Sequence, residues 1–163
     1  MRRIEGNTGL AYIECVNPIK NRWFVRWDIQ PKENEPDLVT YMEEELYRRP
    51  ELSEIRANVI AYYNGLCDQE ILSGLKIEGN TVWLSTENQF NYKAAWDFAL
   101  AKDGMNLPVT FKLGDDQNPV YRVFETVQDL DGFMITVMGY IQLTLSKYWE
   151  IKDSIDWSVY ELE

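Results

Sequence analysis

Carboxylates that stand close together are the residues of this sequence best suited to chemistry. Asp115 and Asp116 lie in a stretch rich in turn-forming residues, where two carboxylates could bind a cation. Residues 129–132 read Asp-Leu-Asp-Gly, like the start of a calcium-binding loop, but Tyr140 stands where such a loop needs its bidentate glutamate. Turn formation and helix capping explain both clusters, so we predict no metal site.

The absence of histidine from the 163 residues excludes several classes of active site. A Ser-His-Asp triad, a Cys-His dyad and His-ligated zinc or haem all require an imidazole. Cys15 and Cys67 are isolated in the sequence, so we expect two reduced thiols rather than a disulfide framework or a zinc site. No phosphate-binding glycine loop occurs. We therefore predict a non-enzymatic protein without a cofactor, while an enzyme that works through paired carboxylates stays open as an alternative.

The chain is acidic, with 16 basic and 27 acidic side chains and a net charge of −11 at pH 7. This charge repels nucleic-acid phosphate and anionic lipid, so we expect no nucleic-acid partner and no membrane partner. The run Glu43–Glu45 is either a solvated charge cluster or a site for a basic partner. The longest uncharged stretch, residues 132–146, is too short to span a bilayer, and we expect a soluble intracellular protein.

Six tryptophans could form a partner surface or a platform on which sugars stack. Three of them occupy apolar positions of expected helices or strands, where we predict core residues: Trp83, Trp96 and Trp149. The other candidates lie in residues 22–30, where Trp23 and Trp27 share one strand face and Phe24 lies on the other. We predict that Trp23, Phe24 and Trp27 offer a surface to a partner.

Alternation of apolar and polar residues predicts a β segment at the N-terminus. Residues 10–16 and 22–30 have β-favouring side chains and are joined by a turn at 18–21, which predicts a hairpin. Residues 31–37 contain two prolines and three carboxylates, which predicts a solvated loop. Residues 38–47 fit either a strand or a helix, and the Arg-Arg-Pro that follows favours the strand.

From residue 50 onward the sequence predicts a helix, a hairpin, a helix, a second hairpin and a third helix. The first helix is expected at 50–72 and the first hairpin at 75–84. The second helix is expected to be capped by Ser85 or Thr86 and to end at Gly104, the second hairpin to span 107–124 and the third helix 126–152. The last helix is apolar on nearly every side, which predicts the most buried helix of the fold. Its expected inner stripe consists of Leu130, Met134, Val137, Met138, Ile141, Leu145 and Trp149.

The predicted fold class is α+β, in which antiparallel hairpins are covered by helices and preceded by an N-terminal β segment. We expect a strand-rich segment at residues 1–48, an α+β core domain at 49–153 and a C-terminal tail at 154–163.

Two sequence segments resemble a family of uncharacterised proteins from gut-bacterial prophages and phages. Residues 88–95 read NQFNYKAA and residues 107–112 read LPVTFK, and the likeness extends from about residue 39 to residue 161. The family is related to a domain of unknown function that is often encoded near phage tail and tail-fibre genes. It offers no catalytic motif to carry over to this chain.

The resemblance implies a phage accessory or structural protein, in the cytoplasm of the bacterial host or associated with the virion. A phage tail protein or another phage structural protein is the implied partner, and a homo-oligomer is a second expectation. A glycan-binding module and, less favoured, a carboxylate-dependent enzyme of a tail complex stay open as alternatives.

Overall fold

The computed structural model describes residues 1–161, and the chain forms two compact units. One unit contains Met1–Tyr62 together with the segment from Ser154 onward, and the other contains Tyr63–Asp153. The long helix α1, Leu52–Ser73, contributes residues to both units. The fold is α+β with antiparallel strand pairs, as the sequence predicts.

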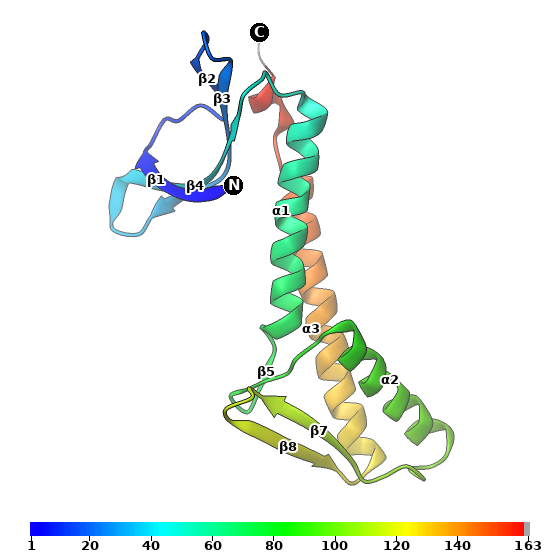
Figure 1. The fold of residues 1–163 in the computed structure, drawn as a ribbon. Coiled ribbons are helices and arrows are strands. Elements are labelled where there is room, and N and C mark those ends of the chain that lie inside the picture. Colours follow the sequence, from blue (N-terminus) through cyan, green and yellow to red (C-terminus); the bar gives the residue numbers. More distant parts are fainter. Residues whose placement is uncertain (162–163) are drawn as a thin grey trace. The chain divides into compact units, whose positions relative to one another are not determined.

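Four antiparallel strands in the order β1-β4-β3-β2 form the sheet of the first unit (Figure 1). Their bounds are Arg2–Asn7, Ile13–Asn17, Arg22–Lys32 and Glu35–Leu46. The predicted β2–β3 hairpin and the strand preferred for residues 38–47 are confirmed. The expected loop at residues 31–37 is wrong, because β3 and β4 continue through it to a turn at which Asn34 adopts a φ of 64°.

A β-bulge interrupts the regular alternation of β3. The register with β4 shifts between Trp27 and Gln30, and Asp28 in the gap has a φ of 51°. Up to the bulge, Val25 and Trp27 face one side of the sheet and Arg26 faces the other, and all three are buried. Both faces of β3 are therefore buried at residues 25–27.

The first turns of α1 and a short C-terminal helix complete the first unit. Tyr62 of α1 packs edge-on against Trp27, with ring centroids 5.9 Å apart. The 3₁₀ helix η1, Trp157–Tyr160, places the buried Tyr160 so that its hydroxyl donates to the Arg26 carbonyl oxygen at 2.9 Å. The segment expected as a C-terminal tail thus contributes to this core.

The second unit follows the predicted order of helix, hairpin, helix, hairpin and helix (Figure 1). After α1 come β5 Lys76–Ile77, β6 Asn80–Thr81, α2 Thr86–Ala101, β7 Val109–Gly114, β8 Pro119–Phe124 and α3 Val127–Asp153. Local side chains set the helix starts. Ser85 Oγ accepts from the Asn88 amide at 3.2 Å, and Thr126 Oγ1 accepts from the Asp129 amide at 3.1 Å.

Aromatic rings from four elements form the core of the second unit. The rings of Phe111, Phe124 and Phe133 pack with centroids 5.1–5.5 Å apart, and Tyr92 of α2 closes the cluster 5.3 Å from Phe133. Further along α3, Tyr140 donates a hydrogen bond of 2.7 Å to the Glu70 carbonyl oxygen of α1. The end of α1 and the second half of α3 therefore pack together.

The expected burial of α3 is wrong for two residues of its predicted inner stripe. The buried residues of α3 are Leu130, Phe133, Met134, Val137, Thr144 and Tyr148. Met138 is instead 53% exposed and Trp149 49% exposed. Within the second unit the buried residues lie on one side of α3, and apolar residues on its other sides, such as Leu143, are exposed. Trp83, also expected in the core, is 38% exposed.

Candidate functional site

The acidic clusters that the sequence singles out have structural roles. Asp115 Oδ1 accepts from the amides of Gln117 and Asn118 at 2.8 and 2.7 Å, which closes the β7–β8 turn. Asp129 accepts from the Thr126 hydroxyl at 2.7 Å in the cap of α3. Within residues 1–161, no group of three or more His, Cys, Asp or Glu side chains is placed to hold a metal ion.

Two carboxylates of the run Glu43–Glu45 form ion pairs within the chain. Glu43 is buried, and its Oε2 accepts from Arg26 Nε at 3.0 Å across the β3–β4 pair. Arg22 Nε donates to Glu45 at 2.5 Å, and this hydrogen bond lowers the pKa of Glu45. Glu43 also accepts from Arg2 at 3.3 Å, so β3 and β1 of the same chain supply basic partners for these two carboxylates.

Only part of the predicted aromatic partner surface lies at the surface. Trp27 is 2% exposed, so its assignment to a partner surface is wrong. Its place is in the core, because the sheet and α1 cover that face of β3. Trp23 and Phe24 are partly exposed on opposite faces, and the guanidinium groups of Arg22 and Arg26 lie 5.2 and 5.3 Å from the Phe24 ring centroid. A partner role for Trp23 and Phe24 stays a prediction.

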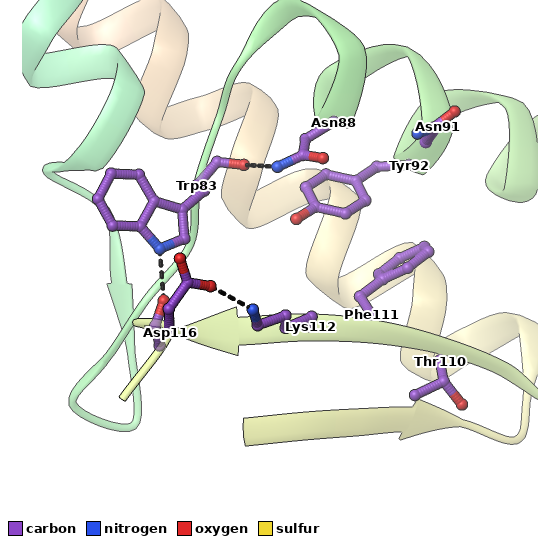
Figure 2. Close-up of a pocket in the computed structure, with 9 residues that line it drawn as sticks. Trp83, Asn88, Asn91, Tyr92, Thr110, Phe111, Lys112 and Asp116 are labelled. Carbon is purple, nitrogen blue, oxygen red and sulfur yellow. Dashed lines mark hydrogen bonds and ion pairs between the residues drawn. The ribbon is translucent and has the colours of Figure 1, made fainter. Parts of the chain in front are cut away.

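A cavity of about 450 Å³ opens between α2 and β7 in the second unit (Figure 2). Its lining combines aromatic rings, amides and one ion pair, contributed by Trp83, Asn88, Asn91, Tyr92, Thr110, Phe111, Lys112, Gly114 and Asp116. The sequence does not reveal this cavity, because its residues come from three separate segments and none of them forms a motif.

The side chains around the cavity are held in place by hydrogen bonds. Trp83 Nε1 donates to the Gly114 carbonyl oxygen, which fixes the indole at the end of β7. Asn88 Nδ2 donates to the Trp83 carbonyl oxygen at 3.0 Å. Lys112 Nζ pairs with Asp116 at 2.5 Å, and this hydrogen bond lowers the pKa of Asp116. The aromatic and polar groups therefore face a preformed space (Figure 2).

Tyr92 differs from the other lining residues in being almost fully buried. Only 4% of its surface is exposed, and burial raises the pKa of its hydroxyl. The ring packs 4.5 Å from Phe111, while the hydroxyl points into the cavity (Figure 2). That hydroxyl has no hydrogen-bond partner among the described residues.

A second candidate region is an apolar row on α3, which we call the α3 stripe: Ile135, Met138, Gln142, Leu145 and Trp149. These residues follow one another at alternating steps of three and four, the spacing of a coiled-coil seam. Ile135, Met138, Gln142 and Trp149 are exposed, and Leu145 is partly buried. The stripe can pack another helix, since four of its five side chains are exposed.

A family model described as Domain of unknown function (DUF4376) matches residues 54–163, more than half of the chain. The chain belongs to this family. The DUF4376 match includes the cavity and the α3 stripe, and it leaves the four-stranded sheet outside. No curated protein and no solved structure matches the chain.

The DUF4376 description itself names no activity. The resemblance noted in the sequence reached back to about residue 39, whereas the family match begins at Glu54. Among residues 1–161, none of the helices combines the length and the apolar content that crossing a membrane requires.

Proposed function

We propose that this chain is a non-enzymatic accessory or structural protein of a phage or prophage, and that it associates with a second copy of itself through the α3 stripe. The main observation behind this proposal is that α3 exposes large apolar side chains at heptad spacing, although the helix already has a separate buried side. Such a surface on a water-soluble domain is typical of an interaction site.

Burial of the stripe supplies a driving force of moderate size. Complete burial of an Ile, Leu or Met side chain contributes about 1.5–3 kcal/mol, so side chains that are already half-buried contribute about half as much. Four such side chains on each of two copies compete with an association cost of about 4–15 kcal/mol. We therefore expect a reversible assembly whose population depends on protein concentration.

Three features favour a second copy as the partner. A heptad stripe is self-complementary, since the same helix in another copy offers side chains at the same spacing. No charged residue lies between Gly132 and Ser146, so two acidic chains can bring this region together without like charges meeting. Gln142, at the middle of the stripe, is polar and can set the register, as single polar seam residues do in coiled coils.

Glycines beside the stripe also support close helix packing. A Cβ added at Gly132 or Gly139 would meet no atom within 4 Å, so nothing in the described chain requires glycine there. Glycine inside a helix costs about 1 kcal/mol relative to alanine. The small size of Gly132 and Gly139 would allow a second helix to approach this side of α3 closely.

The phage context comes from the sequence resemblance. The resembled family is related to a domain of unknown function that is often encoded near phage tail and tail-fibre genes, which suggests a role in tail assembly with a tail protein as a further partner. The protein would then be made in the cytoplasm of the bacterial host and could become part of the virion.

The test is sedimentation equilibrium of the full chain from about 5 to 500 µM, a range suited to micromolar association. We expect a rise in mean mass with concentration, and at least a tenfold weaker association for Met138→Glu. Leu143→Glu is the matched control, because Leu143 is 73% exposed and also apolar but lies off the stripe. A monomer throughout the range, or equal effects of the two variants, would overturn the proposal.

A further inference from the structure

We infer that the cavity between α2 and β7 binds a neutral saccharide ring. This inference is independent of self-association through α3, since it rests on other residues of the second unit. The site is assembled from the end of the β5–β6 hairpin, the first turns of α2, and β7 with its following turn.

The first observation is the Tyr92 hydroxyl. A side chain that is 4% exposed and belongs to an aromatic core ordinarily has no polar atom, or has one that is hydrogen-bonded inside the protein. Here the hydroxyl points into the cavity, and no described residue binds it (Figure 2). A phenol can both donate and accept, which suits a ligand hydroxyl that does the same.

The second observation is the combination of aromatic and amide groups around that hydroxyl. The hydrogen bond to Gly114 holds the indole of Trp83 at one end of the cavity, and the ring of Phe111 lies next to Tyr92. Asn88 uses its Nδ2 to bind the Trp83 carbonyl oxygen, so its Oδ1 stays available as an acceptor. A sugar ring offers matching chemistry, with apolar C–H groups on its faces and hydroxyls around its rim.

The third observation is the charge of the lining. Lys112 and Asp116 are the ionisable residues of the lining that carry charge at neutral pH, and they pair with each other at 2.5 Å. No unpaired cation is left to bind a phosphate or a carboxylate, and no unpaired carboxylate to bind an amine. The lining therefore favours a neutral ligand over a charged one.

The size of the cavity agrees with a small ligand. Ligand pockets in proteins span about 300–1,000 Å³, and this cavity of about 450 Å³ lies in the lower part of that range. Mixed polar and aromatic linings are typical of sites that recognise a ligand by orientation as well as by burial.

The experiment is an NMR titration of the full ¹⁵N-labelled chain with D-glucose, D-galactose and N-acetyl-D-glucosamine, each tested separately. The reporter is the indole N–H of Trp83, assigned through a Trp83→Phe variant. We expect a saturable shift of this signal with at least one sugar, and no shift with inorganic phosphate at the same concentration.

Two tyrosine variants separate recognition from folding. Tyr92→Phe removes only the hydroxyl that faces the cavity and keeps the ring in the core, so we expect about tenfold weaker binding, the loss of one hydrogen bond, without a lower melting temperature. Tyr140→Phe removes a hydroxyl bound to Glu70 elsewhere in the unit and should leave sugar binding unchanged.

Failure of all three sugars to shift the Trp83 signal saturably would overturn the inference. So would equal binding by wild type and Tyr92→Phe, or a response to phosphate in place of sugar. Each of these outcomes leaves the mass measured for self-association unaffected, so the two proposals can fail separately.

Discussion

The buried ion pair between Arg26 and Glu43 allows a quantitative prediction about the first unit. Both side chains lie in the sheet, 5% and 4% exposed, and join β3 to β4 at 3.0 Å. Arg26 also donates to the Ala11 carbonyl oxygen at 2.9 Å and to Glu14 at 2.8 Å. Glu14 is half-exposed, so Glu43 is the partner that compensates the buried charge of Arg26.

The expected magnitude follows from the burial of the two partners. Removal of one partner from a buried pair costs about 3–5 kcal/mol, since the other charge stays buried. Glu43→Leu should lie near the lower end, about 3 kcal/mol, because Glu14 and the Ala11 carbonyl oxygen still contact Arg26. Glu14→Gln should cost less than about 1 kcal/mol, as is usual for an exposed partner.

The double variant Arg26→Met/Glu43→Leu shows whether Glu43→Leu destabilises the unit by leaving a buried charge without its partner or by loss of packing. Replacing both partners of a buried pair by apolar groups is often neutral or stabilising, so we expect most of the loss to be recovered. Native-state hydrogen exchange followed by mass spectrometry measures this, since peptides of β3 and β4 report the first unit and peptides of α3 serve as an internal control. The reasoning is refuted if the first unit opens as readily in the double variant as in Glu43→Leu, or if Glu14→Gln lowers the stability of this unit as much as Glu43→Leu does.

Two further predictions concern the second unit. Lys147 donates to Glu70 at 2.7 Å and, together with Tyr148, lowers the pKa of Glu70. The ionised Glu70 therefore stabilises the folded state at neutral pH. This stabilisation is lost as the pH falls through the pKa of Glu70 in the folded state, which lies below the usual glutamate value of about 4.3. Acid unfolding should show that Glu70→Gln removes this part of the pH dependence, worth less than about 1 kcal/mol because Lys147 is half-exposed. Leu130→Ala should lower the free energy of unfolding by about 2–5 kcal/mol, as for a buried core residue. Trp149→Ala, measured at low protein concentration, should change it by less than about 1 kcal/mol. Equal losses of stability in urea unfolding would contradict the observed exposure of Trp149.

Local signals in the sequence identify most of the second unit. Caps at Ser85 and Thr126 mark the two helix starts, and the turn residues around Gly79 and Asp115 mark the two hairpins. These signals act within a few residues of the chain. They can therefore be read without any knowledge of tertiary contacts.

Tertiary pairing explains the parts that the sequence does not reveal. Strand β1 reads Arg-Arg-Ile-Glu-Gly-Asn, which has no apolar alternation, and it is a strand because it pairs with β4. Glu43 is buried because Arg26 lies opposite on β3, a register that local composition does not specify. The α2–β7 cavity likewise depends on three segments that meet only in the fold.

Helix α3 shows a different limit. Its apolar residues surround the helix, so periodicity cannot distinguish the side buried within the chain from a side that another chain buries. The sequence therefore predicted Met138 and Trp149 as core residues, while the structure leaves them exposed. Under the proposed self-association, the apolar character of both sides has a physical reason.

The most direct test of that account is the environment of Trp149 as a function of protein concentration. The chain is labelled with 5-fluorotryptophan, and the ¹⁹F signal of Trp149 is assigned by its absence in Trp149→Phe. We predict that this signal moves from a solvent-exposed to a protected position over the concentration range in which the solution mass rises, and that the Met138→Glu variant shifts both changes to at least tenfold higher concentration. A Trp149 signal that stays solvent-exposed while the mass rises would place the contact elsewhere and contradict the role of the α3 stripe.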